Sequence, residues 1–215
     1  KNQSILNIKK INFSNHGNKK NKMYGELFDK KFKIIFNDDY KKINFKLLNT
    51  GIKVSIDLDE INKNFLSGIV KSKVLKSKLK FNFNYSNKKI TIYNSYFRNK
   101  HLTFKNKSVI NYNPFFDISS VISIEEINSK LLKELNINNI LRYKTLIKKI
   151  NSKNEINFKS KKFSNNLIDN LNLNLNLAYG RLVFSKRIEI SENILLCLGN
   201  INLVEEYPIL YFDCS

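Results

Sequence analysis

The sequence has no tryptophan, only two prolines, two cysteines and two histidines among its 215 residues. So few prolines favour long strands, because proline removes an N–H from the hydrogen-bond ladder of a sheet. So few histidines and cysteines leave no ligand spacing for zinc. P-loops, glycine-rich dinucleotide loops and Gly-x-Ser-x-Gly elbows are also missing. Adjacent carboxylates such as Asp38 and Asp39 would point to opposite faces of a strand. We therefore predict no enzyme activity, no catalytic residue, no metal and no cofactor.

Arginine is scarce although the chain is strongly basic, with 38 Lys and Arg against 18 Asp and Glu and a formal charge of +20. Such a balance ordinarily indicates a nucleic acid or an anionic membrane as partner. However, Lys, Asn and Ile dominate together, and AT-rich codons give that composition without selection for a polyanion. Nucleic-acid recognition also favours arginine, which occurs only at positions 98, 142, 181 and 187. We predict no nucleic-acid partner, and only weak, salt-sensitive attraction of outward-facing lysines to DNA or anionic vesicles.

No apolar run reaches the roughly 18 residues of a membrane-spanning helix, and no signal peptide is visible. The chain starts at Lys1 without an initiator methionine and stops at Ser215, directly after an apolar run at 207–212. We expect a fragment of a longer protein.

The strongest positive signal is strict alternation, Leu-Asn-Leu-Asn-Leu-Asn-Leu at 171–177. Side chains alternate between the faces of a strand, so all the leucines fall on one face and all the asparagines on the other. The same period of two recurs at 53–58, 80–85, 89–93 and 187–190. The sequence predicts a sheet with one apolar face.

Short polar turns every eight to twelve residues predict an antiparallel meander. Expected strands lie at about 4–13, 23–28, 30–37, 41–48, 51–58, 67–75, 77–85, 88–96, 101–105, 108–112, 115–124, 153–163, 167–178, 181–190, 193–203 and 207–213. The spacing of Ile and Leu changes to a helical period at 127–150, which predicts one helical insert. The predicted fold is mainly β, an elongated meander curled like a taco into a groove. We expect one β-rich fragment, 1–215, in which meanders at 1–126 and 151–215 flank the insert.

The apolar face requires a cover, and one helical segment cannot cover some fifteen strands. Either the sheet folds over into a sandwich or barrel, or it curls into a trough that stays apolar inside. A trough without polar anchor points suits acyl chains, because hydrocarbon requires apolar area and no directional bonds. The predicted lipid-contacting residues are Phe81, Phe83, Ile90, Ile92, Leu171, Leu173, Leu175, Leu177, Ile188 and Ile190.

The sequence alone does not decide whether its two cysteines form a disulfide. If Glu205 and Glu206 formed a two-residue hairpin turn, Cys197 and Cys214 would face each other, and an oxidising compartment would allow a bond. However, Glu-Glu is a poor hairpin turn, and Pro208 would interrupt the second strand. The sequence therefore favours two unlinked, half-buried thiols.

The section from Leu79 to Ser215 resembles the C-terminal region of the AsmA-like family, the group of TamB and YhdP. The resembling features are the meander at 78–85, the helical insert at 127–150 and the stretch at 170–202. In that stretch a Leu-Asn ladder leads to Gly-Arg-Leu-Val-Phe, then to an Ile-Glu-Ile strand and Gly-Asn-Ile-Asn-Leu. The first 75 residues match only in general strand pattern.

The resemblance implies a bridge-like protein that carries phospholipid between membranes and serves outer-membrane biogenesis. It implies a location in the bacterial cell envelope, with an inner-membrane anchor N-terminal to this chain and the β-rich part in the periplasm. Phospholipid acyl chains would be the partner. Two alternatives stay open: a lipopolysaccharide-transport-type β-jellyroll, and a structural or adhesive β-solenoid without a ligand.

Overall fold

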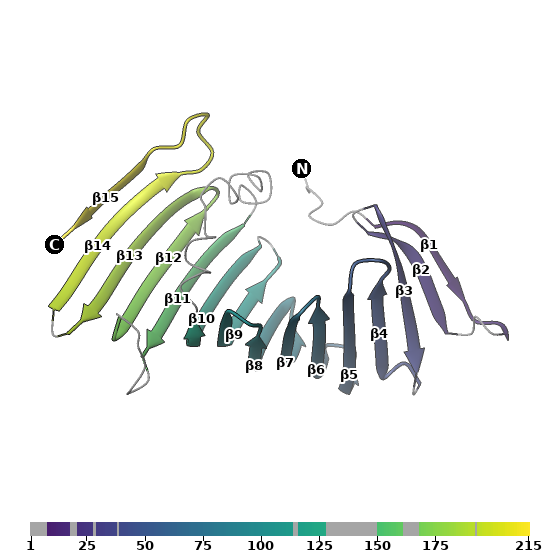
Figure 1. Ribbon diagram of the computed structural model, residues 1–215. Coiled ribbons are helices and arrows are strands. Elements are labelled where there is room, and N and C mark those ends of the chain that lie inside the picture. The colour runs from purple at the N-terminus through teal and green to yellow at the C-terminus, as the bar shows by residue number, and fades with distance from the viewer. Residues whose placement is uncertain are drawn as a thin grey trace. The chain divides into compact units, whose positions relative to one another are not determined.

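The computed structural model describes residues 8–17, 21–27, 29–37, 39–113, 116–127, 150–160, 168–191 and 193–215 (Figure 1). The chain divides into two compact units, which we describe separately. Unit 1 comprises Lys1–Asn87 with Phe97–Lys100, and unit 2 comprises Lys88–Tyr96 with His101–Ser215. The described residues are mainly β-strand and contain no α-helix. The predicted fold class is confirmed.

Unit 1 is an antiparallel meander in which each strand pairs with its neighbours in the sequence. Its strands are β1 (Ile8–Ser14), β2 (Lys22–Leu27), β3 (Lys30–Asn37), β4 (Lys42–Leu47), β5 (Ile52–Asn62), β6 (Phe65–Val74) and β7 (Ser77–Ser86). The pairing places the predicted apolar alternation on one face. Phe32 lies opposite Leu47 and both are buried, while Ile34 lies opposite Phe45.

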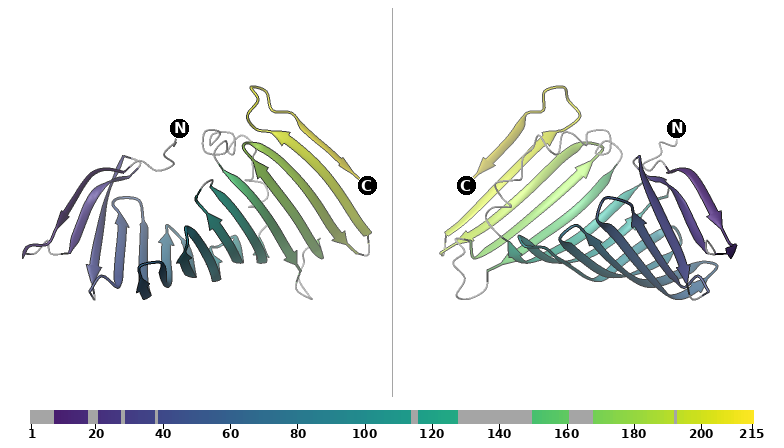
Figure 2. Two further views of the ribbon diagram at one scale, coloured as in Figure 1. Left: turned by 180° about the vertical axis from the view of Figure 1, so that it is seen from behind. Right: turned by 45° about the vertical axis from the view of Figure 1, so that its right-hand side comes forward.

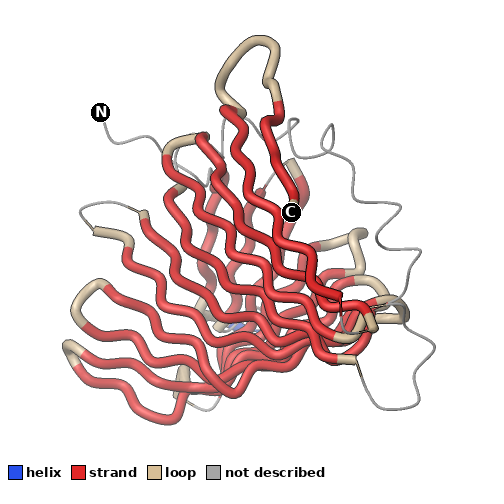
Figure 3. Tube along the Cα trace, turned by 90° about the vertical axis from the view of Figure 1, so that its left-hand side faces the viewer, coloured by secondary structure: helices blue, strands red, loops and turns tan. Residues whose placement is uncertain are grey.

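Within unit 2 the strands likewise follow the order of the sequence, from β8 to β15; the last two residues of β8, Phe97 and Arg98, are assigned to unit 1. Its strands are β8 (Lys89–Arg98), β9 (Leu102–Asn111), β10 (Asp117–Ile127), β11 (Asn151–Lys159), β12 (Asn170–Ala178), β13 (Arg181–Ile190), β14 (Asn193–Asn202) and β15 (Leu210–Cys214). Both views of Figure 2 show these strands side by side. In Figure 3 the strands, drawn red, likewise run beside one another, with loops at their ends.

One pair departs from the predicted antiparallel order. Strands β10 and β11 are parallel, with Asp117 opposite Asn151 and Ile124 opposite Phe158. Antiparallel neighbours can be joined by a tight turn, whereas parallel neighbours need a connection of about a dozen residues or more. Residues 128–150 separate the two strands, which is long enough for such a connection. The helical insert predicted at 127–150 lies almost wholly outside the described residues, and Ile127 itself ends β10.

The predicted break between strands at 101–105 and 108–112 was wrong, because β9 runs through it. The Ser95 hydroxyl contacts both the N–H and the carbonyl oxygen of Asn106, at 2.6 Å each. A side chain of β8 thus completes the hydrogen bonding of β9 at this point. The polar Asn-Lys pair at 106–107 belongs to a continuous strand and not to a turn.

The prediction of two unlinked thiols was also wrong, since a disulfide joins Cys197 to Cys214. The two residues are direct partners in the β14–β15 register. Strand β14 ends at Asn202 and β15 begins at Leu210, so the connection is longer than a two-residue turn. Pro208 lies in this connection and interrupts no strand. The geometric objection to the disulfide therefore does not apply.

Few side chains in the described part of the chain are deeply buried. The buried apolar residues there are Phe32, Leu47, Phe158, Ile188, Cys197, Ile201 and Leu203, and no side chain is fully enclosed. Two packed layers would normally bury a continuous core between them. Within each unit the side chains of the described strands instead pack mainly against those of neighbouring strands in the same sheet. Most of the apolar face is therefore half-exposed.

Candidate functional site

The Leu-Asn alternation of β12 forms the centre of the apolar face of unit 2. Tyr179 and Gly180, with φ of 48° and 96°, make a two-residue turn into β13. Turns with positive φ at both central residues match the twist of paired strands and fix their register. This register sets Leu171 opposite Ile188 and Leu177 opposite Leu182. The predicted one-faced arrangement of the leucines is present.

Each leucine of β12 therefore has a neighbour on both sides. On β11, Leu171 faces the buried Phe158, and Leu173 faces Ile156. On β13, Leu175 faces Phe184, whose partner in turn is Gly199 of β14. A Cβ at Gly199 would collide with the Phe184 ring, so the aromatic ring lies directly over this glycine. We call this surface the leucine face; its β12 members are Leu171, Leu173, Leu175 and Leu177.

The exposure of the leucine face varies along the C-terminal strands, since Cys197 and Ile201 on β14 are buried. Ile188 is only 6% exposed, whereas Leu195, its partner on β14, is 41% exposed. On β15, Leu210 and Phe212 are 39% and 64% exposed. Ile190 lies two residues beyond Ile188 on the same strand and is half-buried.

The sequence reasoning missed a group of polar residues on the leucine face: Asn106, Ser108, Ser120, Ser152 and Asn154. The pairing from β9 to β12 places them on the same side as the leucines, with Asn154 directly opposite Leu175 and Ser152 opposite Leu177. Ser108 donates to the Asn106 side-chain oxygen at 2.9 Å and contacts the Ser120 hydroxyl at 2.9 Å. Asn154 donates to Ser152 at 3.0 Å. The face thus carries polar anchor points, contrary to expectation.

Lys186 is a second polar member of the leucine face. Its direct partners are Leu173 on β12 and Cys197 on β14. A long lysine side chain can lay its methylene groups on apolar neighbours while the ammonium reaches water. The period of two within β13 already places Lys186 on this face, between Phe184 and Ile188. The sequence reasoning missed it because it considered only the apolar members of the alternation.

The opposite face of unit 2 is polar, as the asparagines predict. Asn174 donates to Asn172 at 3.2 Å and to Ser185 at 3.3 Å. Arg187 and Glu189 form an ion pair of 3.0 Å. Hydrogen bonds from Asn170 and from Arg187 hold the pKa of the Glu189 carboxyl below its ordinary value. These contacts stabilise the sheet from the side away from the leucines.

A hollow of about 500 Å³ also lies over this polar face, from β8 to β12. Its lining includes Tyr93, Lys107, Lys153, Glu155 and Asn176. Lys153 and Asn176 are direct partners across β11 and β12, on the side away from the leucines. Most of the lining thus belongs to the polar face, although Ser108, Ser120 and Asn154 of the leucine face also contribute to it.

The remaining predicted residues fall in both units. In unit 1, Phe81 lies opposite Val70 and Phe83 opposite Gly68. Both phenylalanines are half-buried, and they share the apolar face of that unit. In unit 2, Ile90 and Ile92 are half-buried on β8.

Among the described residues, no group of His, Cys, Asp and Glu could hold a metal ion. The described residues include no helix that is long and apolar enough to cross a membrane. Comparison of the sequence with protein-family models and curated proteins, and of the structure with solved structures, finds no match.

Proposed function

We propose that this chain is part of a bridge-like protein that carries phospholipid between membranes, with the leucine face holding acyl chains. The observation that supports it most is the combination of an extended, largely apolar face with very little deep burial among the described residues. Each buried CH₂ of a lipid contributes about 0.8 kcal/mol, so such a face can retain hydrocarbon through area alone. The proposal requires the sheet to curl, so that acyl chains lie against its apolar face.

The disulfide supports the compartment that this function requires. Disulfides persist in oxidising compartments, which include the bacterial periplasm, and are rare in the cytosol. Cys197 is 6% exposed, so its bond to Cys214 lies within the sheet and not on a loose tail. We place the β-rich part in the periplasm of a bacterial envelope, anchored to the inner membrane by a segment outside this chain.

The best test changes one residue of the leucine face. Leu173 is a poor choice, since a carboxylate there would lie opposite Lys186 and be compensated. Leu175 lies between Asn154 and Phe184, which carry no charge, and Lys186 lies only on its diagonal, two residues beyond Phe184. Leu175→Asp would put a charge without a direct counter-ion against hydrocarbon, where its desolvation costs several kcal/mol. We expect co-purified phospholipid to fall sharply while the protein stays folded.

Asn176→Asp is the matched control. It adds the same charge one residue away, on the opposite face and beside Lys153. Mass spectrometry of bound lipid and thermal melts of wild type and both variants measure the result. A wild type without lipid would favour the structural solenoid, and bound lipopolysaccharide would favour the jellyroll alternative. If Leu175→Asp alone fails to fold, Leu175→Asn removes the apolar contact without a charge. Unchanged lipid in that variant would contradict the proposal.

A further inference from the structure

The polar face of unit 1 carries lysines in direct register. Lys33 of β3 pairs with Lys46 of β4, which pairs with Lys53 of β5. Lys53 pairs with Lys73 of β6, which pairs with Lys78 of β7. We call these five residues the lysine row. Neighbouring strands lie about 4.8 Å apart, so the row crosses five strands over about 19 Å.

A second line of positive charge lies beside the lysine row. Lys71 and Lys80 are direct partners two residues further along β6 and β7, on the same face. Asp57 lies 3.1 Å from the Lys71 ammonium and 3.9 Å from that of Lys42. One carboxylate is thus shared between two lysines next to the row.

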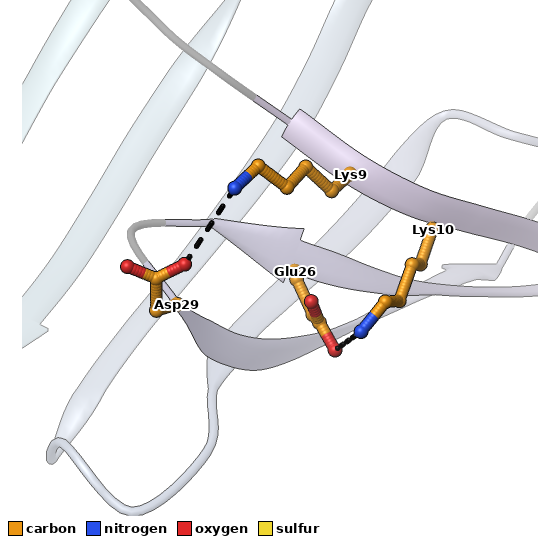
Figure 4. A network of polar contacts seen from close by, with 4 residues as sticks. All are labelled: Lys9, Lys10, Glu26 and Asp29. Carbon is orange, nitrogen blue, oxygen red and sulfur yellow. Dashed lines mark hydrogen bonds and ion pairs between the residues drawn. The ribbon is translucent and has the colours of Figure 1, made fainter.

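The structure gives no ion pair between the lysine row and a described acidic residue. Lys33 lies 5.9 Å above the Tyr24 ring, and the other four members of the row are exposed. Figure 4 shows the contrast at the N-terminal edge of the same unit. There Lys10 binds Glu26 at 3.0 Å and Lys9 reaches Asp29 at 3.8 Å.

Like charges directly opposite each other destabilise a sheet. Four successive Lys–Lys pairs therefore weaken unit 1 in isolation, and a layer of anions would relieve that repulsion. All five ammonium groups extend from one face of consecutive strands. A polyanionic surface can therefore meet them together.

We propose that the lysine row is a docking surface for an anionic phospholipid headgroup layer. Base recognition in nucleic acids most often uses the bidentate fork of arginine, or aromatic stacking in single strands. Strands β3 to β7 contain no arginine, and in the described part of the chain only the Tyr24 ring lies against a lysine of the row. Phosphate groups without bases match this chemistry, since long lysine stems deliver point charges to a surface. The inference rests on unit 1 alone and is independent of lipid binding by the leucine face.

The test measures vesicle binding of the full chain at physiological salt. Vesicles of phosphatidylcholine with phosphatidylglycerol are compared with vesicles of phosphatidylcholine alone. The row variant is Lys46→Gln, Lys53→Gln and Lys73→Gln together. Each lysine near an anionic surface accounts for about fivefold in affinity, so we expect a loss on the order of 100-fold. Its melting temperature should equal or exceed that of wild type, because repulsion is removed.

The control variant removes the same charge from unit 2, by Lys107→Gln, Lys153→Gln and Lys159→Gln. Its affinity for anionic vesicles should fall by less than about tenfold if the lysine row acts as a unit. Equal losses in both variants, or no preference of wild type for anionic vesicles, would overturn the proposal. A duplex and a single-stranded oligonucleotide complete the experiment. If the row variant loses oligonucleotide binding and keeps vesicle binding, the surface is a nucleic-acid site instead.

Discussion

Removal of the disulfide between Cys197 and Cys214 should release the last strand without unfolding unit 2. All five side chains of β15 are exposed, so the strand is attached to β14 by backbone hydrogen bonds and by the disulfide. The cysteines are 17 residues apart, and a loop of this size corresponds to about 3 kcal/mol in the chain-entropy model. In the double variant Cys197→Ala/Cys214→Ala, we expect the free energy of opening β15 locally to be lower by about this amount.

Hydrogen exchange measures the effect at single amides. Ser215 and Leu196 exchange both backbone hydrogen bonds, at 2.8 and 2.9 Å. Antiparallel pairs alternate, so the Asp213 amide should also bind β14. A loss of about 3 kcal/mol speeds exchange at these two amides on the order of 100-fold, while those of β12 and β13 stay protected. Reductant should reproduce the effect in wild type and change nothing in the variant. Equal protection of β15 in both proteins would refute the reasoning.

Two further predictions concern the stability of unit 2. The pKa of Glu189 is lower in the folded protein than its unfolded value of about 4.3. The ionised carboxylate therefore stabilises the folded state above the unfolded pKa, and this contribution is lost as the pH falls through the folded pKa. Urea midpoints across acidic pH should therefore fall less steeply in Glu189→Gln than in wild type, and parallel curves would contradict the assignment. Gly199→Val should cost about 1–3 kcal/mol in urea unfolding, because the Phe184 ring occupies the space of the new side chain. Adding Phe184→Leu should restore part of that loss; strictly additive losses would show that the two residues do not collide.

Local pattern was enough to predict most of the strands and the leucine face. The alternation at 171–177 assigns every residue of β12 to a face without knowledge of its partners. The same arithmetic that places Cys197 opposite Cys214 holds in the structure. What failed there was the assumption of a two-residue turn, because a longer connection can keep the same register.

Features that depend on distant pairing could not be predicted. Asn154 lies opposite Leu175 through the β11–β12 register, and Ser120 lies opposite Asn154 only because β10 and β11 are parallel in one particular register. The alternation within β13 assigns Lys186 to the leucine face, but only the register shows that its partner there is Leu173. The lysine row needs four registers at once, and a one-residue slip in any of them would send a lysine to the other face.

The pairing of each strand with its sequence neighbours gives this fold the energetics of a linear chain of elements. In such a system, stability is approximately a sum of strand terms and nearest-neighbour terms, as in an Ising model. Damage should then stay local: a weak interface lets the sheet fray from its nearer end while the far strands persist. Strand number also becomes an evolutionary variable, because duplication of a hairpin adds two interfaces and disturbs none of the others.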